Sequence, residues 1–127
     1  MTRSLIDTGI LIDHLNGSQE ARDFLARCMA GSQPPYASVL TRIEVLAGML
    51  PEEEEATREL LGLFRWVPVD EAIADRAGDL SRTYRRRYPG VDLPDYVIAA
   101  TAEFLCATLI TLNVKHFPMV ARKERPY

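Results

Sequence analysis

Residues 4–13 read SLIDTGILID, an apolar run that is interrupted by Asp7 and then by the turn-forming pair Thr8-Gly9. A short apolar run that ends in such a pair is typical of a buried strand that leads into a helix. In open parallel sheets, ligands bind at the carboxyl edge of the strands. We therefore expect Asp7 to lie at the edge where a functional site would form.

The composition is that of one ordinary domain without a strong charge bias. The chain has 127 residues, and its 15 basic and 18 acidic residues give a formal net charge of −3. This charge provides no general attraction to nucleic acid, so such a contact would need a local basic strip. Cys28 and Cys106 lie far apart in apolar, helical-looking stretches. They predict reduced, buried thiols in a cytoplasmic protein.

Neither apolar run of the sequence has the features of a targeting or membrane segment. The run after Arg3 is short and contains Asp7, which does not fit a secretory signal. The run at 96–112 contains Glu103 and falls short of the roughly 20 apolar residues that span a bilayer. We expect both runs to belong to a folded core and the protein to have no membrane partner.

The rest of the chain alternates between short strands and helices. After the opening strand, the pattern predicts strands at 36–37, 65–69 and 108–112, and helices at 9–15, 19–30, 39–50, 51–64, 70–88 and 94–106. This alternation predicts one α/β domain over residues 1–127, with a central parallel sheet flanked by helices in three layers. The tail after Phe117 has no clear pattern, and no element is assigned to it.

Several acidic residues have a structural explanation as well as a functional one. Backbone amides of its own turn could satisfy Asp7. Asp95 lies at the start of a helix, where the dipole favours a carboxylate, and Asp92 could cap the same helix. Glu44 lies on or beside a face of a nearly apolar helix that we expect to be buried. A buried carboxylate is costly unless it is paired or bound to a metal.

Considered together, these acids indicate a site for a divalent cation. Asp7, Glu44 and Asp95 lie on three different elements, and Asn113 follows the last predicted strand, so all four could meet at one edge of the sheet. Uncompensated carboxylates in one cleft repel each other, and a divalent cation relieves that repulsion. Oxygen ligands favour Mg²⁺ or Mn²⁺ over zinc. The two histidines are interpreted as solvated or packed side chains.

Four stretches contain these residues: LIDTGILID, SVLTRIEVLAG, LPDYVIAATA and LITLNVKHF. In this order and at these separations, they resemble PIN-domain ribonucleases, and most closely the VapC toxins of toxin–antitoxin pairs. The resemblance implies a Mg²⁺- or Mn²⁺-dependent endoribonuclease that acts on an RNA such as tRNA or mRNA. It also implies a homodimer and a cognate antitoxin that wraps the toxin and blocks its metal site.

The resemblance also implies roles for individual residues. The catalytic acids and metal ligands are Asp7, Glu44 and Asp95, Asn113 is a further metal ligand, and Thr8, Thr111 and Asp92 support them. Many relatives carry an acid at the position of Asn113, and an acid is also common at the position of His116. An amide oxygen coordinates magnesium without adding negative charge. We therefore expect one well-held ion, and a second that arrives, if at all, with substrate phosphate.

The densest basic group lies near the end of the helix predicted at 70–88 and contains Arg82, Arg85 and Arg86, our candidate RNA contacts. Successive residues diverge by about 100° around a helix, so one or two of them can face one groove. The structural alternative is that cations suit the C-terminal end of a helix, where Asp79 can pair with Arg82.

Two other functions fit parts of the sequence, and a group of apolar residues has two possible roles. Asp-Thr-Gly after an apolar run resembles the active-site loop of aspartic proteases, although those enzymes are all-β and this chain is rich in helical patterns. A PIN-like module that binds RNA with weak catalysis would fit the neutral Asn113. The apolar residues that could form a dimer face, or else pack in the core, are Ile10, Leu11, Leu15 and Leu46.

Overall fold

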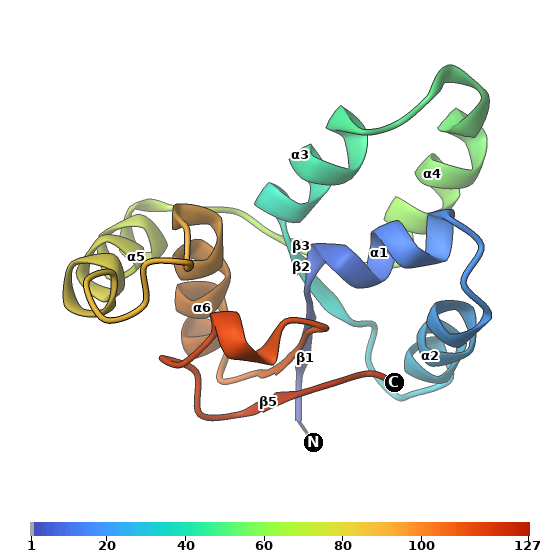
Figure 1. Cartoon of the computed structure of the whole chain (residues 1–127). Helices are drawn as coiled ribbons and strands as arrows, with labels where there is room; N and C mark the ends of the chain where they lie inside the picture. The colour runs from blue at the N-terminus through green and yellow to red at the C-terminus, as the bar shows by residue number, and fades with distance from the viewer. Residues whose placement is uncertain (1) are drawn as a thin grey trace.

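The structure, a computed structural model, describes residues 2–127 and is built on a five-stranded sheet (Figure 1). All neighbouring strands are parallel, and their order in the sheet is β3-β2-β1-β4-β5. The strands are β1 (Ser4–Ile6), β2 (Tyr36–Ser38), β3 (Arg65–Val67), β4 (Thr108–Ile110) and β5 (Lys123–Glu124). The predicted parallel sheet is confirmed. β5 lies in the tail to which the sequence pattern assigned no element.

Helices cover both faces of the sheet, as the alternation of elements predicted. In Figure 1, α5 and α6 lie on one side of the sheet and α1 and α2 on the other. The α-helices are α1 (Thr8–Leu15), α2 (Gln19–Met29), α3 (Val39–Ala47), α4 (Glu54–Leu61), α5 (Glu71–Tyr84) and α6 (Leu93–Leu105), and the short 3₁₀ helices are η1 (Pro51–Glu53) and η2 (Val114–His116).

Three of these helices end at least three residues earlier than the sequence pattern predicted, and one of them is α4, which ends at Leu61 before Gly62. α3 ends at Ala47, because Gly48 forms its C-terminal cap. α5 ends at Tyr84 and does not reach Tyr88. Tyr88 precedes a proline, and the proline ring disfavours the helical conformation in the residue before it.

The hydrophobic core has two halves, one on each face of the sheet. Leu5 and Leu109 pack in the half that α5 and α6 cover, whereas Ile6 and Ile110 pack in the half that α1, α2, α3 and α4 cover. Successive side chains of a strand point to opposite faces, so neighbouring residues enter different halves. Because both faces are covered, the central strands β1 and β4 contain consecutive apolar residues rather than an alternation of apolar and polar residues.

The sheet grows in opposite directions from β1, and this topology places the candidate site. The chain adds β2 and β3 on one side of β1, and it then returns through α5 and α6 to add β4 on the other side. Ligands of open α/β sheets bind at the carboxyl edge where the strand order reverses. Here the edge lies between Asp7, which follows β1, and Thr111, which follows β4, and the Asp7 N–H donates to Ile110 O at 3.0 Å.

The prediction of two buried cysteines is wrong for Cys106. Both thiols are free, but Cys28 is half-buried and Cys106 is exposed. Cys106 ends α6 in the left-handed conformation, with φ 52°, which turns it out of the helix. Two hydrogen bonds close the end of α6, from Ala107 N to Ala102 O and from Cys106 N to Glu103 O. This arrangement is a Schellman motif, in which glycine usually occupies the Cys106 position.

Within residues 2–127, every helix is too short or too polar to cross a membrane.

Candidate active site

The Asp7 carboxylate is held by donors from two different elements. Oδ1 accepts a hydrogen bond from the Thr8 N–H at 2.9 Å, at the first residue of α1. Oδ2 accepts one from the Thr111 hydroxyl at 2.7 Å, beyond the end of β4. The local amide therefore satisfies one oxygen, as the structural explanation proposed. The other oxygen is bound by a residue that lies 104 positions away in the sequence.

Thr8 also connects Asp7 to Glu44. Its Oγ1 lies 2.8 Å from Glu44 Oε1 and 2.9 Å from Thr41 Oγ1. An ionised carboxylate only accepts hydrogen bonds, so Thr8 donates to Glu44 and the Thr41 hydroxyl donates to Thr8. Thr41 is fully buried, and the sequence analysis missed it. The available signal was its position three residues before Glu44, which places both on one face of α3.

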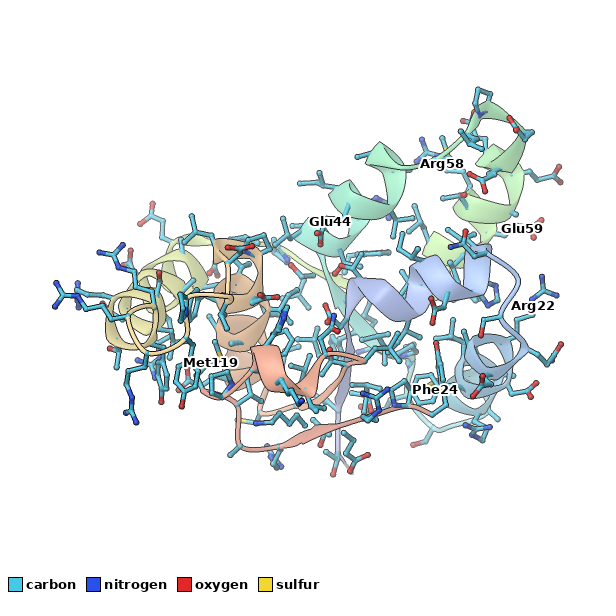
Figure 2. All side chains as sticks on the ribbon, viewed as in Figure 1. Arg22, Phe24, Glu44, Arg58, Glu59 and Met119 are labelled. Atoms are coloured by element: carbon cyan, nitrogen blue, oxygen red, sulfur yellow. The ribbon has the colours of Figure 1, made fainter. Side chains whose placement is uncertain are left out.

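Glu44 lies beside the buried residues of α3, as predicted, but its own side chain is exposed. The buried residues of α3 are Thr41 and Val45, whereas the side chain of Ile43 is 62% exposed. α3 is thus apolar on part of its solvent side as well. Figure 2 shows Glu44 on α3, beyond the carboxyl edge of the sheet. Because Glu44 is exposed, its burial no longer requires a bound ion. Glu44 is linked to Asp7 only through Thr8.

Asp95 lies near the start of α6 and is half-buried. Its Oδ2 accepts a hydrogen bond from the backbone N–H of Asp92 at 3.2 Å, and His116 Nδ1 lies 3.6 Å from the same oxygen. Burial raises the pKa of Asp95 above its ordinary value, while the Asp92 hydrogen bond and His116 oppose the rise. The negative charge of Asp7 also raises the pKa of Asp95. The two carboxylates therefore lie close enough to repel each other.

His116 and Asn113 take positions that the sequence left open. His116 is exposed, as a solvated histidine would be, but it neighbours Asp95 and so belongs to the site. Asn113 enters the hydrogen-bond network through its backbone, since its N–H donates to Thr111 Oγ1 at 3.0 Å. Thr111 is fully buried and lies between Asp7 and Asn113 in this network. The role of Thr111 as polar support is therefore structurally reasonable.

The side chains do not form a closed cage for a metal ion. Across residues 2–127, no group of three or more His, Cys, Asp and Glu side chains is placed to hold one. Magnesium is usually held by one or two carboxylates, together with water and substrate phosphate. The carboxylates of Asp7 and Asp95 match this way of holding magnesium, because both offer oxygen atoms as ligands. The assignment of metal ligands stays a prediction.

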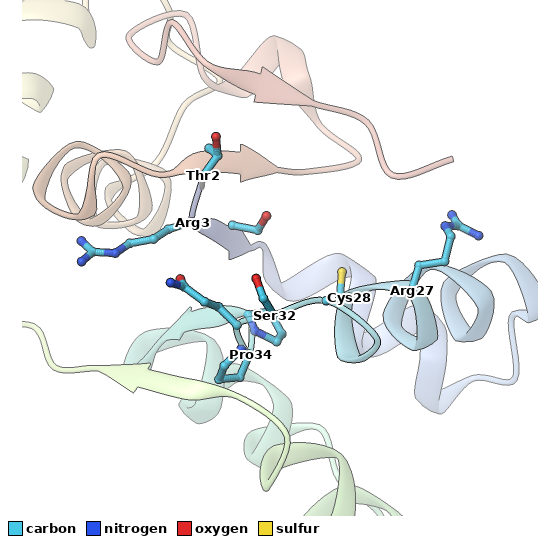
Figure 3. A pocket seen from close by; sticks show the side chains of 10 residues that line it. Thr2, Arg3, Arg27, Cys28, Ser32 and Pro34 are labelled. Carbon is cyan, nitrogen blue, oxygen red and sulfur yellow. The ribbon is translucent and has the colours of Figure 1, made fainter.

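A cavity of about 350 Å³ lies at the opposite, amino-terminal edge of the sheet. Figure 3 shows it between the start of β1 and the end of α2, with Cys28, Ser32 and Pro34 around it. No acidic side chain lines it. In the same view, the side chains of Arg3 and Arg27 point away from its centre. This cavity has no part in the carboxylate site.

The candidate RNA-binding arginines differ in their surroundings. Arg82 pairs with Asp79 at 2.8 Å on the surface, as the structural alternative predicted. Arg85 caps the end of α5, and its positive charge lowers the pKa of Tyr96 against the larger effect of burial, which raises it. Arg86 is exposed.

Comparison with known proteins identifies the family. The PIN domain matches residues 4–123, nearly the whole chain. The chain belongs to the PIN-domain family. Ribonuclease VapC10 of Mycobacterium tuberculosis is 42% identical over 123 residues, which cover 97% of this chain and 92% of that relative. Ribonuclease VapC19 of the same organism is also 42% identical and is covered to 98%. The predicted resemblance to VapC ribonucleases is confirmed.

Solved structures agree with this PIN-domain assignment. A toxin–antitoxin complex from Klebsiella pneumoniae contains a chain with 32% identity and a TM-score of 0.81, and 98% of each chain is covered. A DNA-bound VapBC complex from Salmonella typhimurium matches with a TM-score of 0.81 at 20% identity over both whole chains, which shows the shared fold alone. The aspartic protease alternative is wrong, because its all-β fold is incompatible with this parallel α/β sheet.

Proposed function

We propose that this PIN domain is the endoribonuclease toxin of a VapBC-type pair and that its site binds Mg²⁺ or Mn²⁺. The observation that carries the proposal is the Asp7 carboxylate at the switch point of the sheet, which Thr8 and Thr111 hold from two different elements. The 42% identity to two VapC ribonucleases supports RNA as the substrate. The network from Thr8 to Glu44 supports a third acid in the same site.

The side chains of Asp7, Asp95 and Glu44 would hold the ion, and Asn113 would add a neutral oxygen. When bound, a divalent cation lowers the pKa of water and stabilises negative charge on the phosphoryl oxygens. Thr8 and Thr111 keep the Asp7 carboxylate in one orientation before any ligand arrives. Because Asn113 carries no charge, we assign one ion to the protein and a second, where present, to the substrate complex.

A cleavage assay with the purified chain tests this function. We expect folded RNA, such as a tRNA mixture, to be cut in Mg²⁺ into fragments with 5′-phosphate and 3′-hydroxyl ends. Water then attacks phosphorus, and the 3′ oxygen leaves with a proton. The 5′ ends are identified by their ligation without prior phosphorylation. Binding of the same RNA without cleavage would favour the alternative, a PIN-like binding module.

We assign phosphate contact to Arg85 and Arg86, because Arg82 is already paired with Asp79. Replacing both by glutamine is expected to raise KM and to leave kcat unchanged. The slope of log KM against log salt should fall by about one for each lost phosphate contact. Arg58→Gln is the matched control, since Arg58 lies on α4 and faces Glu54 at 3.9 Å. An unchanged KM in the double variant would remove these arginines from the interface.

An antitoxin is the partner that we propose, supported by the 32% identical chain from a Klebsiella pneumoniae toxin–antitoxin complex. Of the residues that could form a dimer face or else pack in the core, Ile10 and Leu11 are fully buried and pack in the core. Ile43 and Leu50, exposed by 62% and 54%, offer apolar surface for a partner or a second copy instead. Sedimentation of the chain, alone and with the product of an adjacent small reading frame, measures both associations.

A further inference from the structure

The last four residues, 124–127, form a segment that we call the C-terminal strap. It begins in β5, which pairs with β4 so that Glu124 lies opposite Ile110. Just beyond this pair, the Thr111 N–H donates to Glu124 O at 3.0 Å. Figure 1 shows β5 along the edge of the sheet and the chain ending beside α2. The strap therefore starts next to β4 and finishes among the helices on the other side of β1.

One part of the strap fixes the backbone around Thr111. Arg125 Nη1 donates to Leu112 O at 2.7 Å, and a charged donor makes a stronger hydrogen bond than a neutral one. The backbone is thus tied to the strap at Thr111 through its N–H and at Leu112 through its carbonyl oxygen. The Thr111 hydroxyl donates to Asp7 Oδ2. A displacement of this backbone would move the donor that holds one oxygen of Asp7.

The other part of the strap fixes α1. The Tyr127 hydroxyl donates to Asp13 Oδ2 at 2.7 Å, and Asp13 lies on α1. The first N–H of α1, that of Thr8, donates to Asp7 Oδ1. Burial, followed by the hydrogen bond to Asp13, raises the pKa of Tyr127 to about 12. The hydroxyl therefore remains a protonated donor throughout the physiological pH range.

We propose that the C-terminal strap sets the orientation of the Asp7 carboxylate, with Arg125 and Tyr127 as positioning residues for metal binding. Both oxygens of Asp7 are held only while α1 and the end of β4 keep their separation, and the strap contacts both elements. Neither Arg125 nor Tyr127 contacts Asp7 in the structure, so each acts through other residues. The inference rests on the proposed function, because it requires Asp7 to be a metal ligand.

Calorimetric titration of the full chain with Mn²⁺ tests this role through affinity rather than activity. We expect Tyr127→Phe to weaken Mn²⁺ binding by about 3- to 10-fold, less than the roughly 10- to 100-fold loss typical of residues that hydrogen-bond a ligand directly. At saturating metal, kcat should equal that of wild type. Lys123→Met is the matched control, because its Nζ donates to Phe117 O and Val120 O and not to either holder of Asp7. It should keep wild-type affinity.

A double-mutant cycle separates positioning from a general effect of the tail. Thr111→Val removes the donor to Asp7 Oδ2, so Arg125→Gln, which acts through this part of the backbone, should weaken binding less in that background than in wild type. Arg125→Gln provides an independent second variant, with an expected loss of similar size to that of Tyr127→Phe.

Three outcomes are informative in different ways. Wild-type Mn²⁺ affinity in both Tyr127→Phe and Arg125→Gln would overturn the inference, as would an equal loss in Lys123→Met. If either result comes with lost binding in Asp7→Asn, the proposed function stands without the strap. Unchanged Mn²⁺ affinity in Asp7→Asn would overturn the assignment of the metal site itself.

Discussion

An Asp7→Asn variant is expected to cleave RNA at least about 100-fold more slowly than wild type. The substitution removes the negative charge that would attract a divalent cation. It also replaces one carboxylate oxygen, which accepts from Thr8 or Thr111, by an NH₂ group that can only donate. Asparagine caps a helix about as well as aspartate, so α1 and the overall fold should persist. Initial rates at saturating Mg²⁺ measure the loss, and circular dichroism checks the fold.

Two further measurements make this prediction specific. Asp79→Asn is the matched control, because Asp79 pairs with Arg82 on the exposed side of α5, and its rate should remain at the wild-type level. In the metal-free Asp7→Asn protein, the pKa of Asp95 should fall, since the charge of Asp7 raises it. An NMR titration of the Asp95 carboxyl follows that change. Full metal-dependent activity in Asp7→Asn would contradict the assignment of Asp7 as a ligand.

Removal of divalent cations with EDTA is expected to abolish cleavage, and added Mg²⁺ or Mn²⁺ should restore it. Without a cation, Asp7 and Asp95 repel each other. Across residues 2–127, no closed set of His, Cys, Asp and Glu side chains is placed to retain the ion against a chelator. The ion also binds the folded state alone. At a Mg²⁺ concentration of 100 times Kd, the free energy of unfolding should therefore rise by about 2.7 kcal/mol.

Urea unfolding with and without Mg²⁺ measures this gain independently of catalysis. The Asp7→Asn variant is the control, because the same Mg²⁺ concentration should add little to its stability. Cleavage that continues at the wild-type rate in EDTA would refute metal dependence. A stability gain that is equal in wild type and Asp7→Asn would show that the ion binds elsewhere.

The sequence predicted most of the fold because the central strands β1 and β4 lie in short apolar runs that end at a turn signal. Both halves of the core use neighbouring residues of the same strands, such as Leu5 and Ile6, so hydrophobicity alone locates these strands. β5 has two residues and no apolar signal, and it forms because β4 offers a free edge. Such an element depends on tertiary contact, which a local pattern cannot indicate.

The candidate site was less accessible to sequence reasoning. Asp7 and Asp95 could be placed because each directly follows or begins a recognisable element. The expected burial of Glu44 was wrong because α3 carries apolar residues such as Ile43 on its solvent side, so hydrophobicity did not distinguish the buried face of this helix. The contact of His116 with Asp95 joins a 3₁₀ turn to a helix start. That contact depends on how α6 packs in the folded protein, and the spacing of residues in the sequence does not predict it.

The position of β4 beside β1 also has a consequence for how this protein is made. Asp7 is synthesised before Thr111, which holds its second oxygen and follows 104 residues later. Chains emerge from the ribosome N-terminal end first. The two donors that hold the Asp7 carboxylate, the Thr8 N–H and the Thr111 hydroxyl, therefore come together only after the ribosome has added Thr111. Until then, we expect Asp7 to lack the fixed orientation that we propose for metal binding.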